Sequence, residues 1–204
     1  MRRSLLGLLT LVAVVGLVTT SCQRSATLRV LSINGGKTLR SDLSDFFVYF
    51  DKIDSSNVVL FQVDPDSVPV EMQYLEMGAG LPTWTPYEAL LDKVTISFKS
   101  RITPDVPPPY TTITLPVTQA IQADPSGKSK TTFWITALPT AWKTVVFADF
   151  RNEDDPNQID VVDLAEATMT FSGYDSVANR AVSAAGKFSI EFGNFYDDTS
   201  KFGK

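Results

Sequence analysis

The sequence predicts an all-β fold, an antiparallel β-sandwich of roughly 8–10 strands with at most one short helix. Several short segments alternate apolar and polar residues with period two, which is the pattern of a strand buried on one face. Turn-forming residues separate these segments, and no stretch of about ten residues or more keeps the periodicity of an amphipathic helix. These patterns together favour two packed sheets over an arrangement of helices.

The composition fits a chain with one folded domain and a sizeable core. Of its 204 residues, 44% are hydrophobic and 20% are charged, which is not the composition of a disordered chain. A single cysteine cannot form a disulfide within the chain. The absence of histidine excludes Ser-His-Asp triads, Cys-His dyads and histidine-ligated metal sites. The formal net charge of -5 argues against binding along a nucleic-acid backbone.

The amino-terminal residues have the layout of an export signal. Arg2 and Arg3 precede an apolar run over residues 5–18, and small polar residues follow at 19–21. This run is short for a membrane-spanning helix, which needs about 20 residues. A charged start, a short apolar run and an exit of small residues are typical of a secretory signal peptide, so we expect residues 1–21 to be removed.

The residues at the end of this segment, Thr20, Ser21 and Cys22, resemble the lipobox of bacterial lipoproteins. The resemblance implies that the chain is cut before Cys22, that its sulfur and new amino group are acylated, and that residues 22–26 form a lipidated tether. The pattern departs from that family at Thr19, where lipoproteins usually carry leucine. The alternative is a signal peptide that is cut near Ser21 without lipidation.

The residue after Cys22 indicates the membrane to which such a lipoprotein is sorted. In lipoproteins of Gram-negative bacteria, aspartate at that position tends to retain the protein in the inner membrane, whereas this chain has Gln23. The resemblance therefore implies a protein of the bacterial cell envelope that is attached to the outer membrane through acyl chains on Cys22. More than one acyl chain makes such an anchor stable.

The first strands are predicted from three segments. Residues 27–33 alternate but change phase after Val30, which indicates a β-bulge before the turn at 34–36. The runs 46–50 and 58–63 are continuously apolar and predict strands that are covered on both faces.

A further strand and the one short helix are predicted next. Residues 68–74 alternate, and Pro69 within them suits an edge strand better than a central one. Residues 85–88 combine a capping box with proline at the first helical position, which predicts a short helix.

The second half of the chain repeats the alternating pattern. It is clearest over residues 93–99, where Val94, Ile96 and Phe98 share one face and polar residues share the other. A dense apolar run at 143–148 predicts one more strand that is covered on both faces. The same alternation predicts strands at 113–117, 131–137, 165–172 and 188–192.

We expect a single sandwich domain over residues 27–195, followed by a flexible tail at 196–204. The proline-rich segment 104–109 could instead link two smaller sandwiches. By architectural analogy the domain resembles immunoglobulin-like sandwiches, although the chain lacks their paired cysteines.

An acidic segment supplies the candidate metal ligands. Asp154, Asp155, Asn157 and Asp160 lie close together in the sequence, and Ca²⁺ prefers six to eight oxygen ligands. Their spacing does not match an EF-hand loop. The alternative is a solvated turn, because aspartate, asparagine and proline are good turn formers.

Two aromatic residues in a predicted loop, Trp84 and Tyr87, are the candidate ligand contacts. Exposed rings on loops stack on sugar faces or anchor protein partners. Trp134 lies on the face opposite Phe133 and Ile135, so it is either exposed or covered by a second layer. Core packing is the alternative interpretation for each of these rings.

The predicted function is that of a non-catalytic, lipid-anchored protein of the cell envelope that binds or scaffolds a protein or glycan partner. A glycan- or calcium-binding adhesive module on the cell surface is the alternative. An envelope hydrolase comes third, because no S-x-x-K spacing occurs and no pair of carboxylates is distinguished by its context. No catalytic residue, no cofactor and no nucleic-acid partner is predicted.

Overall fold

The computed structural model describes residues 25–43, 45–51, 56–77, 88–101, 110–124, 126–147, 160–177 and 179–195. Several predicted features lie outside these ranges: the export signal, Cys22, the proline-rich segment 104–109 and the tail at 196–204. The first strand begins at Ser25, inside the predicted tether.

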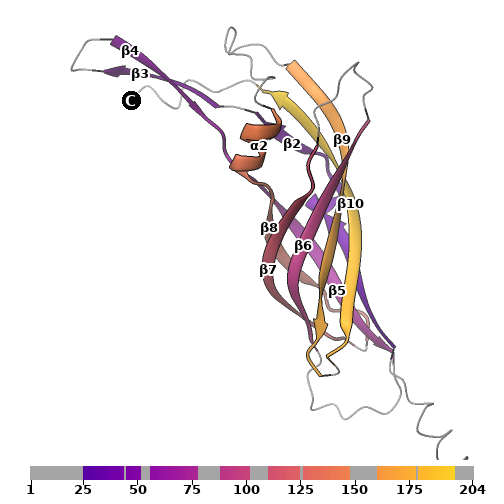
Figure 1. Cartoon of the computed structure of the whole chain (residues 1–204). Helices are drawn as coiled ribbons and strands as arrows, with labels where there is room; N and C mark the ends of the chain where they lie inside the picture. Colours follow the sequence, from indigo (N-terminus) through magenta and orange to yellow (C-terminus); the bar gives the residue numbers. More distant parts are fainter. Residues whose placement is uncertain are drawn as a thin grey trace, which may run out of the picture.

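The described residues form ten strands, which are arranged as two sheets and a separate hairpin (Figure 1). Sheet A has the order β1-β5-β8, with bounds Ser25–Ile33, Asp66–Met77 and Thr131–Leu138. Sheet B has the order β2-β10-β9-β6-β7, with bounds Leu39–Asp42, Ala181–Asn194, Asp160–Asp175, Glu88–Ser100 and Ile113–Gln122. The hairpin consists of β3 (Asp45–Asp51) and β4 (Ser56–Gln62), and the helical segments are η1 (Asn34–Gly36) and α2 (Thr140–Val146).

The prediction of an all-β fold is confirmed, and sheet B is a curled half-barrel. The pairing is not antiparallel throughout, because β2 runs parallel to β10 with Leu39 opposite Ile190. This parallel pair arises where the chain leaves sheet A at the end of β1 and enters sheet B through η1. The predicted turn at 34–36 makes this change of sheet, with φ angles of 54°, 58° and 76° at Asn34, Gly35 and Gly36.

The predicted bulge in the first strand is also confirmed. The register of β1 against β5 shifts between Val30 and Ser32, so Leu31 has no partner residue on β5. The extra residue restores Ile33 to the inward face, where it is buried.

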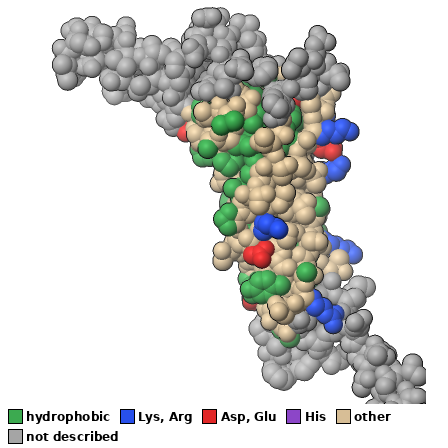
Figure 2. Space-filling model, in the orientation of Figure 1, with side chains coloured by type: hydrophobic (Ala, Val, Ile, Leu, Met, Phe, Trp, Pro, Cys, Tyr) green, Lys and Arg blue, Asp and Glu red, His purple; other side chains and the backbone are tan. Residues whose placement is uncertain are grey.

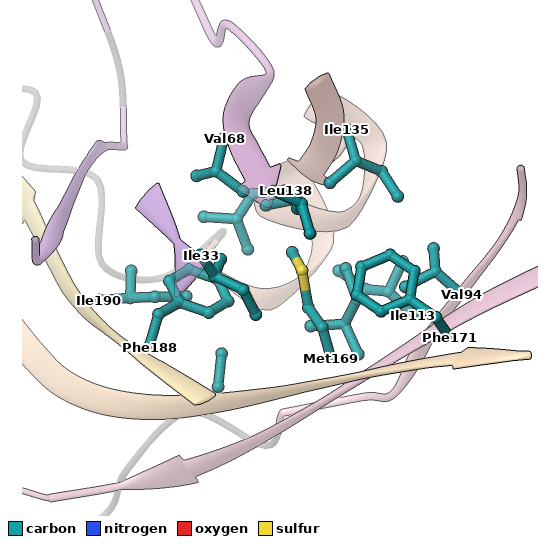
Figure 3. Close-up of a cluster of buried hydrophobic side chains, with 14 of the residues drawn as sticks. Ile33, Val68, Val94, Ile113, Ile135, Leu138, Met169, Phe171, Phe188 and Ile190 are labelled. Atoms are coloured by element: carbon teal, nitrogen blue, oxygen red, sulfur yellow. The ribbon is translucent and has the colours of Figure 1, made fainter. Parts of the chain in front are cut away.

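Apolar side chains from both sheets meet between them and form the core (Figure 3). The alternation of the sequence predicts the inward faces of β6, β9 and β10 correctly, because these residues are buried: Val94, Ile96, Ala165, Ala167, Met169, Phe171, Phe188, Ile190 and Phe192. Sheet A contributes Ile33, Val68, Ile135 and Leu138 to the same cluster.

The expectation that Pro69 marks an edge strand is wrong, since β5 lies between β1 and β8. The structure shows why proline is tolerated there. β1 ends at Ile33, opposite Val70, so at Pro69 the central strand has a partner on one side only, where it lies opposite Trp134. The proline therefore occupies a position where β5 is locally at the edge of the sheet.

The strand predicted at 143–148 is also wrong, because Thr140–Val146 is the helix α2. Local propensity favours a strand here, since threonine and valine are β-branched. Tertiary contacts override it: Phe147 at the helix end packs on Phe192 with ring centroids 4.7 Å apart, and Trp142 stacks on Phe98 at 4.8 Å. The helix predicted at 85–88 has three residues outside the described ranges, and Glu88 begins β6.

The two densely apolar runs in the first half of the chain do form strands, β3 and β4. They pair with each other from Asp45 opposite Gln62 to Asp51 opposite Ser56. Among the described residues no other strand pairs with this hairpin, which projects from the body beyond α2 (Figure 1).

Candidate functional site

Most of the residues that the sequence singles out lie outside the described ranges. These are Cys22, Trp84, Tyr87, Asp154, Asp155 and Asn157. Asp160 is the first residue of β9 and its backbone is opposite Asn194 of β10. Within the described ranges no group of three or more histidine, cysteine, aspartate or glutamate residues is placed to hold a metal ion.

The described part of the chain offers a different candidate, a groove between the last strand of each sheet. Its volume is about 410 Å³, and residues 115–119 of β7 and 133–136 of β8 line it. We call it the β7/β8 groove. It lies where β7 ends sheet B and β8 ends sheet A. Just after β7, Ala123 forms an isolated parallel bridge to Tyr74 of β5, so the chain reaches sheet A at that end.

The floor of the β7/β8 groove is apolar. Ile135 is buried, and Leu115, Val117 and Phe133 are half-buried at the margin of the core. Phe133 packs edge-on against Phe171 of β9, with the ring centroids 6.0 Å apart. The groove thus opens directly onto the side chains of the core.

Trp134 stands at the rim of this groove. The sequence places it on the face opposite Phe133 and Ile135, and the structure confirms this with a residue exposure of 70%. Its partner across the strands is Pro69. An exposed tryptophan beside an apolar groove is typical of a binding surface, because a large ring contributes much contact area when a partner covers it.

The two strand edges that flank the groove carry no charge. Residues 113–122 and 131–138 contain no lysine, arginine, aspartate or glutamate. Soluble proteins usually protect free edges with charged residues, proline or bulges. Here Pro116 interrupts β7, the register of β7 against β6 shifts between Pro116 and Gln119, and the register of β8 against β5 shifts between Thr136 and Leu138. Most of the lysine and arginine side chains seen in Figure 2 lie along the side away from β7 and β8, and a basic group lies beside an acidic one on the face between; hydrophobic side chains lie on the side of β7 and β8.

A hydrogen-bonded segment joins β7 to β8 beside one end of the groove. Asp124 organises it: its carboxylate accepts hydrogen bonds from the backbone N–H groups of Ser126 at 2.8 Å, Lys128 at 2.8 Å and Ser129. Hydrogen bonds from Ser126 and Ser129 hold the pKa of Asp124 well below its ordinary value. Gln73 of β5 ties the loop to sheet A, since its Nε2 donates to the carbonyl of Gly127 at 2.6 Å.

The helix α2 fixes the other end. It follows β8 directly, and the indole Nε1 of Trp142 donates to the carbonyl oxygen of Thr111, just before β7, at 2.9 Å. Tyr110, next to Thr111, donates its hydroxyl proton to the buried carboxylate of Asp163. Burial, together with that carboxylate, raises the pKa of Tyr110 above its ordinary value, so the tyrosine stays protonated and keeps this bond.

Hydrogen bonds therefore tie the chain next to both ends of the two strand edges. Thr118, Gln119 and Thr136 are the polar residues of the groove lining, and the rest of the lining is apolar. An apolar floor between two free strand edges suits an extended polypeptide, which pairs its backbone with an edge and places alternate side chains over the floor. The sequence already contained one indication of this site, the lack of charge in residues 113–122 and 131–138.

Comparisons with protein-family models, curated proteins and solved structures find no match to this chain. Within the described residues, no helix has the length and apolar character that crossing a membrane requires.

Proposed function

We propose that this chain is a non-catalytic, lipid-anchored protein of the bacterial cell envelope that binds an extended segment of a protein partner in the β7/β8 groove. The single observation that carries the proposal is the pair of uncharged strand edges on either side of an apolar groove. The anchor at Cys22 and the outer-membrane location rest on the resemblance of residues 1–22 to lipoprotein signals.

The body is proposed to be an immunoglobulin-like sandwich that is open along one side. Two facing sheets and the paired neighbours β6–β7 and β9–β10 support this description. The curl of sheet B and the parallel pairing of β2 are the features that depart from it.

The mode of binding follows from the energetics of strand edges. An unpaired backbone N–H or C=O group that becomes buried costs about 1–3 kcal/mol, so a partner that covers this groove must supply hydrogen bonds as well as apolar contacts. An added strand supplies both at once. A glycan stacked on Trp134 covers the ring but leaves the edges of β7 and β8 without backbone partners, so we place it second.

The test uses site-specific photo-crosslinking in living cells. A photoreactive phenylalanine derivative at Thr118, which is exposed on β7 in the groove lining, is expected to form a protein adduct. The same group at Ser97 is the matched control, because Ser97 is exposed on β6, which has strand neighbours on both sides.

A second variant ties the adduct to the groove. The adduct at position 118 is expected to disappear in Trp134→Lys and to persist in Leu31→Lys, which places the same charge on the opposite edge strand of sheet A. Equal adducts at positions 97 and 118, or none at either, would contradict the proposed function.

A further inference from the structure

The hairpin β3–β4 is apolar on both of its faces. Residues 46–50 read Phe-Phe-Val-Tyr-Phe and residues 58–61 read Val-Val-Leu-Phe, with no charge among them. Because successive residues of a strand fall on opposite faces, these runs place apolar residues on both sides of the hairpin.

Such a hairpin is not stable by itself in water. Two strands alone are marginally stable at best, and uncharged apolar strands with free edges associate with other strands. Among the described strands, no third strand pairs with β3 or β4 (Figure 1).

We propose that the hairpin β3–β4 of one copy of this chain inserts into the β7/β8 groove of a second copy. This inference rests on the proposed function, because it uses the same groove, and it names the partner. One strand of the hairpin adds to a free groove edge and lays its alternate apolar residues over the floor formed by Leu115, Val117 and Ile135.

The two parts match in length and in chemistry. The hairpin strands are seven residues long, and the groove strands β7 and β8 are ten and eight residues long. The central segments of all four strands are uncharged, so insertion buries no unpaired charge. The hairpin has no third strand among the described residues, and β7 and β8 are each the last strand of a sheet. Pairing between the hairpin and the groove would therefore give both parts an additional strand neighbour.

A lipid bilayer fits the hairpin less well than a second copy does. The outer edges of a two-stranded hairpin leave backbone N–H and C=O groups unpaired, and lipid cannot satisfy them. The paired span of seven residues is also shorter than the 9–11 residues that a membrane-spanning strand needs. Asp45 and Asp51 end β3, and carboxylates are not attracted to anionic lipid surfaces.

The base of the hairpin prevents it from reaching the groove of its own chain. Leu43, which precedes it, is buried and donates its N–H to the carbonyl of Gly193 at 3.0 Å. Val63, which follows it, accepts a hydrogen bond from Thr140 Oγ1 at 2.9 Å. Because Leu43 and Val63 lie next to the ends of β3 and β4, the chain has no long linker that would let the hairpin fold back onto its own groove. The hairpin projects away from the body (Figure 1).

The contact uses different surfaces on the two copies. Such a heterologous interface continues from copy to copy, so it builds a ring if the rotation closes and a filament if it does not. The expected product is therefore an assembly on the envelope that extends beyond a dimer.

Disulfide trapping between full-length chains tests the inference. Two differently tagged chains are co-expressed, one with Val48→Cys in the hairpin and the other with Thr118→Cys in the groove. The expected result is a disulfide-linked species that carries both tags. Ser97→Cys replaces Thr118→Cys in the control pair, and a chain without an added cysteine reports any background from Cys22.

A second variant addresses assembly without disulfides. Val48→Lys with Leu60→Lys is expected to convert the assembly, measured by sedimentation in mild detergent, to single copies while the thermal melting of the body is unchanged. Val145→Lys is the control, because Val145 is exposed on α2 and outside both surfaces.

The outcomes separate this inference from the proposed function. A photo-adduct at Thr118 whose mass is not that of a second copy, and which survives Val48→Lys with Leu60→Lys, overturns the inference and leaves the proposed function standing. A chain that carries both Val48→Cys and Thr118→Cys, and that forms the disulfide only internally, also overturns it. The absence of any position-specific adduct overturns both.

Discussion

The Nζ atom of Lys143, on α2, lies 3.2 Å from Oδ2 of Asp66, at the start of β5, and the lysine side chain is only 2% exposed. The same ammonium group donates to the carbonyl oxygen of Asp42 at 2.7 Å, and the same carboxylate accepts from Ser41 Oγ at 2.6 Å. Asp42 precedes the hairpin β3–β4 and Asp66 follows it. One buried cation therefore joins α2 to both ends of the hairpin base.

Replacing this lysine is expected to destabilise the whole body. Lys143→Met keeps most of the side-chain length but leaves a largely buried carboxylate and a backbone carbonyl without their charged donor. We expect the free energy of unfolding to fall by about 2–3 kcal/mol, measured by urea denaturation.

The matched control is Lys130→Met. Lys130 also forms an ion pair, with Glu71 at 2.7 Å, but its side chain is 54% exposed, so its removal is expected to cost less than about 1 kcal/mol. Equal losses of unfolding free energy for Lys143→Met and Lys130→Met would show that the burial of Lys143 does not increase its contribution to stability.

The strands that were predicted correctly share one property: their burial pattern is local. In β9 every second residue from Ala165 to Phe171 is buried, and a sequence shows such alternation without knowledge of the neighbouring strands. The turn at 34–36 was predictable for the same reason, since asparagine and glycine tolerate positive φ wherever they occur.

The features that were missed depend on strand order, which is not local. β5 is central and β7 and β8 are edges only because of how ten strands assemble, so neither the true position of Pro69 nor the groove followed from alternation. α2 was missed because its β-branched residues favour a strand, and contacts of Trp142 and Phe147 with distant strands decide otherwise. The apolar runs 46–50 and 58–63 predict strands that are covered on both faces, but the sequence does not indicate which part of the structure, or which partner, covers them.

Asp124 is expected to make stability depend on pH. Its pKa is lowered in the folded state, so folded protein binds fewer protons there than unfolded protein, whose aspartate pKa is about 3.9. The stabilisation is fully present above that value and is lost as pH falls toward the folded pKa. Comparing thermal melting of the wild type and Asp124→Asn from neutral pH downward should show a difference that shrinks below about pH 4. A difference that stays constant with pH would contradict this role.

Gly173 is expected to tolerate no side chain. It lies on β9 opposite Leu91, where the register of β6 shifts, and a Cβ atom there would lie 2.0 Å from the carbonyl oxygen of Leu90. Gly173→Ala is therefore expected to lower the free energy of unfolding by about 3 kcal/mol, because backbone atoms of the central ladder must move. At Gly35 the space is open and only the positive φ of 58° opposes a side chain, so Gly35→Ala should cost about 1 kcal/mol in the same denaturation experiment. Comparable losses of unfolding free energy for Gly173→Ala and Gly35→Ala would show that the backbone of β6 moves away from a side chain at position 173 at little cost.

The last prediction concerns the proposed lipid anchor at Cys22, which would hold the binding surface at the membrane. Expressed in a Gram-negative host, the full chain is expected to fractionate with membranes and to gain the mass of its acyl chains after loss of residues 1–21, while Cys22→Ala loses both properties. Since several acyl chains are needed for stable attachment, the mass should correspond to more than one. An unlipidated product cut near Ser21 would remove the anchor from the proposed function. The β7/β8 groove and the hairpin β3–β4 would then be tested in a secreted protein. Copies of that protein would have to assemble without being concentrated by attachment to a membrane.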